Sequence, residues 1–460
     1  MNAIQTNKTY LNFIPFRILS NWSVQHYFEQ ESPYSDKYEL VEIGCFLSRN
    51  KTSIEIKNGV EYKRVTIKTK NGGIYLRDIR FGSNIGTKKQ FLIYEGQFLL
   101  SKIDARNGAF GVVPDGIDGA VITGNFWAFD VNYDLINPHY LTIVTTTPFF
   151  IRFAENASSG TTNRRYLQEI LFLKQKIPLP SLEEQNRLVE SYKTKIRKAE
   201  EMEQQVEVLE KEIEMFLCNK LGVVKNVETA NNNDSFLNFI RYKDLDRWTM
   251  SYIFTNQIYS FKDAKYQIKP IKALLKSFDG GKTPSTSNRN YWNGKMNWFS
   301  AKDMKFLTLN SSEDKITTYA INDAGMRIYP EGTILGVFRS GILRHSFPVA
   351  ILEKPATINQ DLKAMTFDNR LIFNQYALFY MHIFQKFFLE HAQKTGVTVE
   401  SINTDDFMGI PVVLPPLDIQ NIIAQEIHTM KDKIKAIKSK SEFYRYTANR
   451  EFEKEIFNYK

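Results

Sequence analysis

Apolar residues recur in alternating steps of three and four along residues 182–221, with no Gly or Pro interrupting the run. This spacing is the heptad pattern of a coiled coil, narrower than the apolar stripe of a helix that packs on a globular domain. Ser181 and Glu184 form a capping box at its start. The sequence therefore predicts one helix of about 38 residues, ~57 Å long. Its seam consists of Leu188, Tyr192, Ile196, Ala199, Met202, Val206, Leu209, Ile213 and Phe216.

A second run of this kind closes the chain from Leu414 to Lys460. Its start, Leu414-Pro415-x-Leu417-Asp418-x-Gln420-Asn421, repeats Leu179-Pro180-x-Leu182-Glu183-x-Gln185-Asn186. We expect the two helices to pair as an antiparallel coiled coil, since each presents a narrow seam that needs a partner. The alternative is that each helix packs only on its neighbouring block. The second seam consists of Ile423, Ile427, Met430, Ile434, Ile437, Tyr444, Ala448 and Ile456.

The blocks in front of the helices form an internal repeat. Asn12-Phe13-Ile14-x-Phe16-Arg17-x-Leu19-x-x-Trp22 reappears, without gaps, as Asn238-Phe239-Ile240-x-Tyr242-Lys243-x-Leu245-x-x-Trp248. Three weaker pairs follow: Lys37-Tyr38 with Lys265-Tyr266, Arg77–Arg80 with Lys302–Lys305, and Phe98–Ser101 with Ile334–Gly336. Between these anchors the blocks differ freely. The organisation is block 1–180, helix 181–225, Asn-rich linker 226–236, block 237–415 and helix 416–460.

Each block mixes strand and helix signals. Runs of alternating or β-branched residues predict strands, and the aromatic-rich segment 374–389 predicts a buried helix. We therefore expect an α+β fold: two similar globular domains, related by a pseudo-two-fold repeat, with the long helices between them. The predicted strands are 62–70, 90–100, 119–129, 315–320, 333–338 and 348–352.

The composition is that of a protein without disulfide bonds, and its net positive charge indicates a negatively charged partner. The 460 residues carry a net charge of +9 and only two cysteines, without CxxC spacing, so a disulfide framework and a thiolate zinc site are excluded. No signal peptide or membrane-spanning run is present, and a cytoplasmic location is expected. The first helix has ten acids and seven bases, and the second has seven acids and nine bases. The positive excess therefore lies in the blocks, as expected for a nucleic-acid partner.

Catalytic motifs are incomplete. Gly281-Lys282-Thr283 lacks the earlier Gly of a phosphate-binding loop, because position 276 is Lys. Asn137-Pro138-His139-Tyr140 is similar to the catalytic loop of adenine methyltransferases but lacks its second Pro, and no Gly-rich loop for S-adenosylmethionine stands upstream. The six histidines lack metal-ligand spacing, and Asp405-Asp406 and Asp115/Asp118 have the pattern of loop or cap residues. The chain by itself is not expected to be an enzyme or to hold a metal or cofactor.

Lys, Arg, Asn, Ser and Thr mixed with aromatics mark the loops of both blocks. Lys and short hydroxyls suit phosphate oxygens, whereas Arg and Asn can fork onto guanine and adenine edges. In Gly280–Ser285 the glycines would let the backbone approach a ligand closely. A single charged residue on a loop is often only exposed to solvent. The prediction is therefore that these residues together form a DNA-binding surface. The candidate DNA-binding residues are Lys68, Lys70, Arg77, Arg80, Lys102, Arg106 and Asn107 in the first block, and Lys282, Thr283, Ser285, Arg289, Asn290, Lys302, Arg339 and Arg344 in the second.

With these motifs together, the chain resembles the specificity subunits of type I restriction–modification systems over nearly its full length. The resemblance rests on the block–helix duplication, the two Leu-Pro helix starts, and Gly280–Ser285 with Tyr291-Trp292-x-Gly294 and Trp298. Thr395-Gly396-Val397-Thr398 before the second helix, mirrored by Ser159-Gly160-Thr161, is also similar to the family. The first block departs from the pattern, because residues 47–62 contain no Gly-Gly-x-Thr-Pro loop.

The resemblance implies that each block is a target recognition domain for one half of a split DNA sequence. It implies that the helices set the spacer and dock modification (methyltransferase) subunits, through which restriction (motor–nuclease) subunits join. S-adenosylmethionine, ATP and Mg are then expected in those partners. Two alternatives remain from the residues themselves: a coiled-coil adaptor whose blocks bind protein, and a self-sufficient nuclease or methyltransferase, which the incomplete motifs disfavour.

Overall fold

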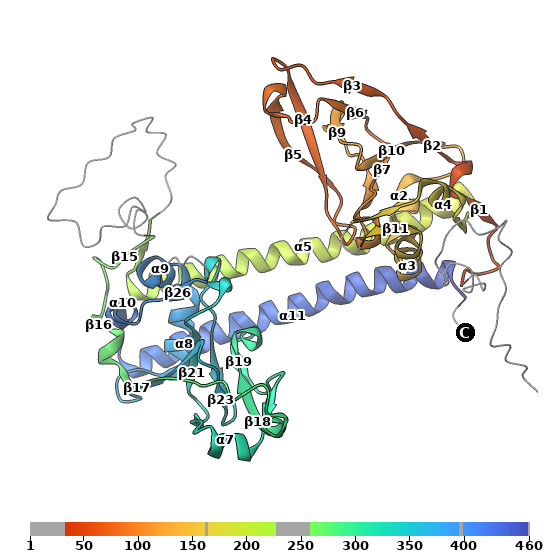
Figure 1. The fold of residues 1–460 in the computed structure, drawn as a ribbon. Helices are drawn as coiled ribbons and strands as arrows, with labels where there is room; N and C mark the ends of the chain where they lie inside the picture. The colour runs from red at the N-terminus through yellow and green to blue at the C-terminus, as the bar shows by residue number, and fades with distance from the viewer. Residues whose placement is uncertain (1–32, 162–163, 227–257, 395–398, 459–460) are drawn as a thin grey trace, which may run out of the picture. The chain divides into compact units, whose positions relative to one another are not determined.

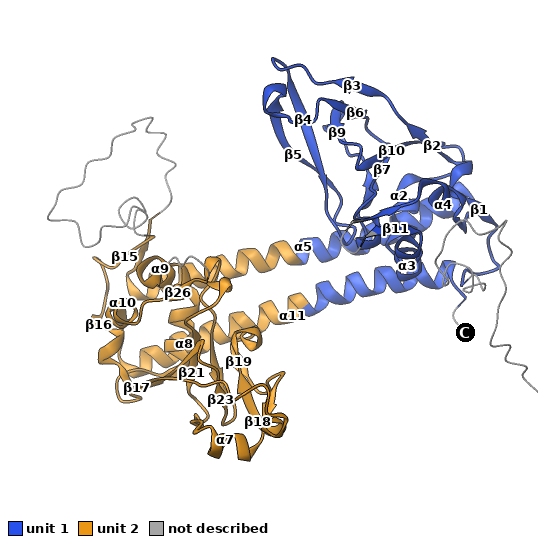
Figure 2. Cartoon of the chain, viewed as in Figure 1, with its two compact units in different colours: residues 1–202, 439–460 blue, residues 203–438 orange. Residues whose placement is uncertain are grey.

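The structure is a computed structural model that describes residues 33–161, 164–226, 258–394 and 399–458. The chain forms two compact units, which we call the first unit (residues 1–202 with 439–460) and the second unit (residues 203–438; Figure 2). The linker 226–236, the repeat anchors at 12–22 and 238–248, and residues 395–398 lie wholly or almost wholly outside the described residues.

A four-stranded sheet of order β2-β10-β7-β8 forms the framework of the first unit (Figure 1). Its core contains Phe98, Phe110, Phe129 and Phe172, all fully buried, and helices pack against it. The framework elements are β1 Leu40–Glu42, β2 Leu47–Asn50, β7 Phe98–Ser101, β8 Phe110–Val112, β10 Phe126–Val131, α2 Pro138–Thr146, α3 Pro148–Asn156, β11 Ser158–Thr161, β12 Arg164–Leu167, α4 Glu169–Lys174 and β13 Lys176–Pro178.

A second sheet is inserted between β2 and β10 of the first unit. It has five strands in the order β3-β6-β9-β4-β5, with small apolar cores around Ile93 and Tyr62. Strands β4 and β5 pair antiparallel as a long hairpin (Figure 1). The strands are β3 Ser53–Glu55, β4 Glu61–Ile67, β5 Ile74–Phe81, β6 Lys89–Ile93 and β9 Ala120–Ile122.

The second unit repeats the framework with a sheet of order β17-β24-β21-β22-β19. Strand pairs β1–β13 and β16–β27 close the two frameworks in the same antiparallel way. The framework elements are β14 Val224–Lys225, β15 Tyr259–Ser260, β16 Gln267–Pro270, β17 Leu275–Gly280, β19 Thr308–Leu309, β21 Ile334–Val337, β22 Val349–Leu352, β24 Leu362–Phe367, α8 Asn374–Ile383, α9 Gln385–Ala392, β25 Gln393–Lys394, β26 Ser401–Ile402, α10 Thr404–Gly409 and β27 Pro411–Leu414.

The insert of the second unit differs from that of the first. It is a three-stranded sheet of order β20-β18-β23 with one short helix, built around Tyr291, Trp298 and Ile316. The predicted α+β repeat is thus confirmed in the topology of the two frameworks, while the inserts differ in topology. The insert elements are β18 Trp292–Phe299, β20 Lys315–Ile316, α7 Thr318–Asp323 and β23 Thr357–Ile358.

Several local predictions were wrong. The single strands predicted at 90–100 and 119–129 are each two strands, because Gly96 and Gly124 lie in the turns that divide them. Residues 315–320 turn into helix α7 after two strand residues, since Thr317 caps the helix by accepting from the Ala320 amide. The predicted helix 374–389 is divided into α8 and α9 at Phe384.

One of the proposed repeat pairs was also wrong. Residues Arg77–Arg80 lie in strand β5, whereas Lys302 and Asp303 lie in a short 3₁₀ helix, Ala301–Asp303. Ser300 and Asp303 close a capping box that fixes this turn, and the β-branched and aromatic neighbours of Asp78 favour the strand. The similar charge pattern therefore belongs to unrelated inserts.

The two long helices are α5, Leu182–Leu221, and α11, Leu417–Ile456, each 40 residues long. They pair antiparallel within each unit, as predicted. In the first unit the Ser441 hydroxyl donates to the Ala199 carbonyl (3.2 Å), and Tyr192 donates to Asn449 (3.1 Å). In the second unit Lys438 pairs with Glu210 (3.3 Å). The predicted seam residues are buried or half-buried, and Phe452 completes the C-terminal seam.

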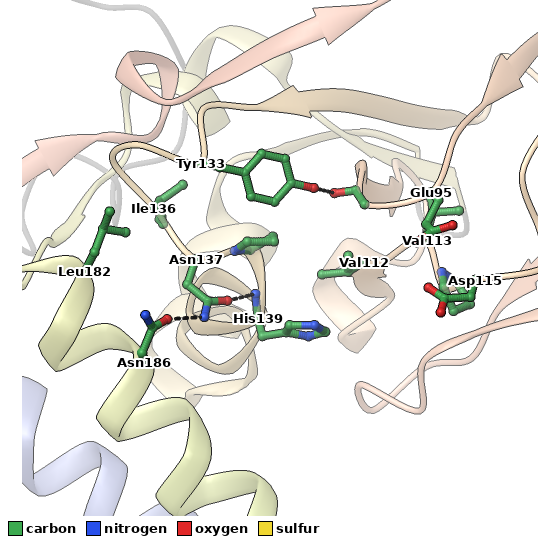
Figure 3. A pocket seen from close by; sticks show the side chains of 13 residues that line it. Glu95, Val112, Val113, Asp115, Tyr133, Ile136, Asn137, His139, Leu182 and Asn186 are labelled. Atoms are coloured by element: carbon green, nitrogen blue, oxygen red, sulfur yellow. Dashed lines mark hydrogen bonds between the residues drawn. The ribbon is translucent and has the colours of Figure 1, made fainter.

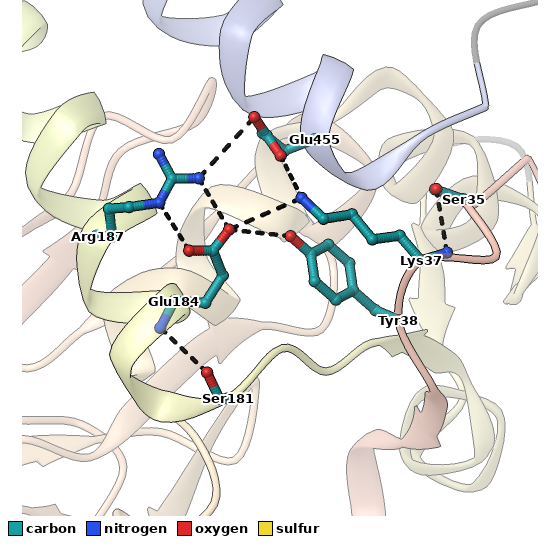
Figure 4. Close-up of polar contacts among 7 residues, drawn as sticks. All are labelled: Ser35, Lys37, Tyr38, Ser181, Glu184, Arg187 and Glu455. Atoms are coloured by element: carbon teal, nitrogen blue, oxygen red, sulfur yellow. Dashed lines mark hydrogen bonds and ion pairs between the residues drawn. The ribbon is translucent and has the colours of Figure 1, made fainter.

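Charged residues tie the helix ends together in the first unit (Figure 4). Glu184, in the first turn of α5, accepts two hydrogen bonds from Arg187 (2.7 and 2.8 Å) and one from the Tyr38 hydroxyl (3.1 Å). Lys37 donates to Glu455 of α11 (2.7 Å). One bond of the predicted capping box is present, in which the Ser181 hydroxyl accepts from the Glu184 amide (3.3 Å), while the Glu184 carboxylate accepts from Arg187 and Tyr38. Among the described residues, no helix is both long and apolar enough to span a bilayer.

Candidate nucleic-acid interface

All fifteen candidate DNA-binding residues lie at the surface. Lys102 and Arg106 are half-buried, and the other thirteen are exposed. They do not form one patch. In the first unit they gather on the β4–β5 hairpin and on the β7–β8 connection, and in the second unit they lie on the insert and on the loop after β21.

The turn of the β4–β5 hairpin is docked on the β7–β8 connection. The Lys70 amide donates to the Asn107 carbonyl (2.6 Å), and the Asn71 amide donates to the Gly108 carbonyl (2.8 Å). Lys70 and Asn71 both have positive φ, near 55°, which non-glycine residues adopt at a cost. These bonds hold the strained turn and bring Lys70 beside Arg106 and Asn107.

A groove of about 1030 Å³ runs between this turn and the helix pair of the first unit. Lys70, Arg106 and Arg445 line it together with Glu200 and Glu453, so the acids of the helices offset part of its positive charge. The turn residues therefore face a surface that carries both positive and negative charge.

Lys102 lies over aromatic rings. Its ammonium is 5.9 Å from the Trp127 ring centroid and 5.6 Å from that of Tyr166. Burial, with a smaller contribution from nearby Arg49, lowers the pKa of Lys102. A half-buried cation of this kind is stabilised by the rings and is a weaker candidate for a phosphate contact than the exposed lysines.

The Gly280–Ser285 loop of the second unit has a structural reason for its glycines. A Cβ on Gly281 would lie 2.0 Å from the Ile358 carbonyl oxygen, so the loop backbone can pack on strand β23 only with glycine there. The close approach is thus to the chain itself, whereas the sequence interpretation assigned it to a ligand. Trp298 donates to the Lys282 carbonyl (3.0 Å), and Trp292 donates to that of Ser285 (3.2 Å). Lys282, Thr283 and Ser285 are held exposed by these bonds.

The turn Asn359–Asp361 connects two sets of candidate residues. Thr283 donates to the Gln360 side chain, and the backbone amide of Arg339 donates to the Asp361 carbonyl (3.2 Å). The structure therefore brings Thr283 and Arg339 to the two sides of one turn. Arg289 and Asn290 lie in a 3₁₀ turn of the same insert, with exposed side chains.

Acidic residues engage two other candidates. Arg344 forms a 2.5 Å ion pair with Glu400, whose side chain is only 4% exposed. The pKa of Glu400 is lowered, chiefly by this hydrogen bond. Lys302 pairs with Asp314 (2.9 Å) and Glu313 (3.4 Å), and these partners raise its pKa. Arg344 is thus oriented by a buried carboxylate, whereas Lys302 is largely neutralised.

An open cavity of about 730 Å³ lies beside the start of α5 in the first unit (Figure 3). Asn137 caps α2 by accepting from the His139 amide (2.9 Å) and donates to Asn186 (2.7 Å), while the Tyr140 hydroxyl donates to the Pro178 carbonyl (2.8 Å). The Asn-Pro-His-Tyr segment thus has a structural role in joining the block to α5. Among the described residues, no cluster of His, Cys, Asp and Glu could hold a metal ion.

The sequence model of the type I restriction modification DNA specificity domain matches residues 36–211 and 264–442. The chain belongs to this family. Each match contains most or all of one framework, its insert and part of one long helix, so the family unit is present twice, as the repeat predicted.

Curated members are similar over part of their length. The chain is 33% identical over 174 residues to the specificity subunit of the type I restriction enzyme EcoR124I/EcoR124II from Escherichia coli, covering 37% of this chain and 42% of that subunit. It is 35% identical over 101 residues to the specificity subunit of the type I restriction enzyme MjaIX from Methanocaldococcus jannaschii. This alignment covers 21% of this chain and 22% of that subunit. The aligned segments thus span less than half of either relative.

A chain from a solved structure, described as the basis of complex assembly and conformational transition of a type I restriction–modification system, has the same fold. It superposes with a TM-score of 0.53, covering 92% of this chain and 97% of that chain at 14% identity. At this identity the similarity concerns the fold alone.

Sequence reasoning missed several residues that build these surfaces. Asp78, Glu400 and Gln360 position cations or loops, but each is a single polar residue without a motif. Arg64 was also missed, although the alternation of strand β4 places it beside Asp78. The signal that could have found it is the pairing of β4 with β5, which the intervening Asn-Gly-Gly turn indicates.

Proposed function

We propose that this chain is the sequence-specific DNA-recognition subunit of a type I restriction–modification complex. Each unit reads one half of an asymmetric bipartite target. The observation that carries the proposal is the contrast within the repeat: two matching frameworks hold inserts of different topology, and ten of the fifteen candidate residues lie on those inserts or on the turns that join them to the framework. Different inserts on one scaffold suit the reading of two different half-sites.

The helices α5 and α11 would set the spacing between half-sites and dock modification subunits. Their support is the buried seam together with apolar side chains that remain exposed outside it. Phe443 is 61% exposed and Tyr446 is 60% exposed on α11, and Val208 and Met215 are exposed on α5. Phe443 and Tyr446 lie three residues apart on one helix face, and such an exposed apolar pair is a candidate contact for a partner. Restriction subunits would join through the modification subunits.

The chain has no catalytic role in this proposal. Modification subunits would supply S-adenosylmethionine, restriction subunits would supply ATP and Mg chemistry, and this subunit would contribute the target. The contacts of Asn137 and Tyr140 support this assignment of catalysis to the partner subunits. They give the methyltransferase-like segment a structural role, since it connects α2 to α5.

The deciding experiment maps methylated bases in DNA treated with the complex of this chain and its modification subunits. A split motif of two unlike halves with a fixed spacer is expected. Binding to that motif should weaken with salt and exceed binding to scrambled DNA. Equal binding to all sequences would instead favour a coiled-coil adaptor whose units bind protein, and methylation by the lone chain would show that it is an enzyme.

A further inference from the structure

Strand β5 of the first unit is exposed along almost its whole length. It lies at the edge of the five-stranded sheet and pairs only with β4 among the described strands. Ile74 alone is buried among its eight residues, and Asp78 is half-buried. Strand β4 in turn meets β9 through one residue pair, Arg64 with Val121. The hairpin is therefore a two-stranded ribbon along the edge of the unit (Figure 1).

The side chains of this ribbon combine positive charge with large apolar groups. Residues 61–81 contain six Lys or Arg against two acids, Glu61 and Asp78. Four large apolar side chains are exposed on β5, and Arg77 and Arg80 stand between them with 60% and 48% of their side chains exposed. The apolar residues are Tyr75, Leu76, Ile79 and Phe81.

A protective role for these charges explains only part of the pattern. Proteins place charged residues and bulges on edge strands to prevent pairing with another strand. The register of β4 with β5 skips Arg77, which makes a bulge there and disfavours the addition of a further strand. Protection does not call for four exposed apolar side chains, whereas apolar contact with thymine methyl groups does use them.

Asp78 organises the arginines. Arg64 forks onto it with two hydrogen bonds of 2.7 Å, and the Arg80 Nε lies 3.2 Å from the same carboxylate. Arg77 is 3.9 Å away. The hydrogen bond from Arg64 lowers the pKa of Asp78, so the carboxylate stays charged. Arg64 thus fixes the carboxylate, and the carboxylate fixes the direction of Arg80.

We propose that the β4–β5 ribbon is the base-reading element of the first unit, entering the major groove with Arg80 and Arg77 on base edges and Asp78 as the residue that positions Arg80. This inference rests on the proposed function. A two-stranded ribbon fits the major groove of B-DNA, and an arginine fork pairs with guanine O6 and N7. The docked turn at Lys70 and Asn71 holds the ribbon in place before DNA arrives, which lowers the entropy cost of binding.

The test uses the full complex with modification subunits and a DNA library in which each position of both half-sites is varied. Arg80→Lys and Arg77→Lys keep the charge but lose the fork. Each is expected to reduce discrimination at one position of one half-site by about tenfold or more, with the other half-site and the salt dependence unchanged. Lys89→Ala on β6, in the same sheet but off the ribbon, is the matched control and should leave every position unchanged.

The outcomes separate this inference from the proposed function. If the unaltered complex shows no sequence preference, the proposed function itself fails. If the unaltered complex is specific and both lysine variants keep full discrimination, the ribbon does not read bases and the inference is overturned. Equal loss of affinity for all sequences in Arg80→Ala, without loss of discrimination in Arg80→Lys, would also overturn it. Discrimination that stays intact at the other positions of the same half-site shows that the first unit of each variant is folded.

A separate experiment tests the positioning role of Asp78. Asp78→Asn should weaken discrimination at the position that Arg80→Lys affects and add nothing further in the double variant, because both changes act through Arg80. A lower thermal midpoint with unchanged discrimination would show that Asp78 is only structural and would remove it from the proposal.

Discussion

Gln185 and Gln420 make the same three hydrogen bonds in the two units. The side-chain amide of Gln185 donates to the carbonyls of Leu135 and Pro180 (3.0 and 2.8 Å) and accepts from the Asn137 amide (2.8 Å). Gln420 donates to Leu371 and Pro415 at the same two distances and accepts from Phe373 (2.8 Å). Both side chains are fully buried. The glutamine of the repeated helix start therefore fastens each long helix to its framework.

Replacing either glutamine should destabilise its unit. Gln185→Ala and Gln420→Ala each leave two carbonyls and one amide without their partner, and the carbonyl of Pro180 or Pro415 among them is in a buried bond, so a cost of about 1–3 kcal/mol in the free energy of unfolding is expected. Urea unfolding followed by circular dichroism measures the loss. Gln204→Ala and Gln425→Ala, exposed positions on the same two helices, are the matched controls. A loss no larger than in the controls would contradict the fastening role.

The Glu184 cluster predicts a pH dependence of stability. Hydrogen bonding from Arg187, with a smaller contribution from Tyr38, lowers the pKa of Glu184 from 4.5 to about 2, against the opposing effect of burial. A carboxyl whose pKa is lower in the folded state stabilises the fold above its unfolded pKa. This stabilisation is therefore present above pH 4.5 and is lost as the pH falls towards 2.

The measurement compares urea midpoints between pH 6 and pH 2.5 for the unaltered chain and for Glu184→Gln. The variant should be less stable at pH 6, and the difference should shrink as the pH falls through the window between 4.5 and 2. Glu183→Gln, an exposed neighbour in the same turn, is the control. A difference between Glu184→Gln and the unaltered chain that does not vary with pH would rule out this titration.

Base-reading and phosphate contacts should separate in the second unit. Arg339→Ala should relax specificity at one position and cost about 1–3 kcal/mol of binding there, because a fork on a base edge is lost. Lys282→Ala should weaken all sequences alike and reduce the salt slope by about one phosphate contact. Binding titrations at several salt concentrations distinguish the two. Unchanged salt dependence in the Lys282 variant would remove that residue from the interface.

Arg344 requires a different substitution. Arg344→Ala would leave the buried Glu400 carboxylate without its partner, and its second oxygen already has no hydrogen-bond partner among the described residues. A loss of stability would then obscure the binding effect. The double change Arg344→Ala with Glu400→Gln avoids the unpaired charge. If Arg344 reads a base, the double variant should lose discrimination at one position while remaining folded.

The sequence predicted best what depends on local, repeated patterns. The heptad spacing indicated both helices and their antiparallel pairing, and the repeated Leu-Pro starts indicated the duplicated framework. The topology of the two inserts could not be predicted from the sequence. Asp78 and Asp303 lie in similar charge patterns, yet Asp78 is in a strand and Asp303 closes a 3₁₀ turn. Pairing with strand β4 determines the first conformation, and the capping box with Ser300 determines the second. The function of Gly281 was misjudged for the same reason, since the Ile358 carbonyl that requires it is 77 residues away.

Exchange of the second block tests the independence of the two readers. Replacing residues 237–413 with the corresponding block of a relative should change one half of the recognised motif and leave the other half unchanged, since each framework carries its own insert and core. Methylation mapping reads the motif directly. A change in both halves would show that the units do not read DNA independently.

The spacing role of the helices can be tested by lengthening both. Inserting one heptad after Glu203 and one after Ile437 preserves the seam, because Ala199 and Ser441 show that these positions lie near one another across the pair. Each helix then grows by ~10 Å, at ~1.5 Å per residue. Along B-DNA, at ~3.4 Å per base pair, this corresponds to about three additional pairs between the half-sites.

The half-sites themselves should stay the same, because neither insert is altered. A heptad in one helix alone should misalign the seam of the pair and lower the urea midpoint without producing an active longer complex. This single insertion is the control for the double one. Methylation mapping of the double variant decides the question: a spacer about three pairs longer is the expected result. An active complex that keeps the original spacer would show that something other than α5 and α11 sets the distance between the half-sites.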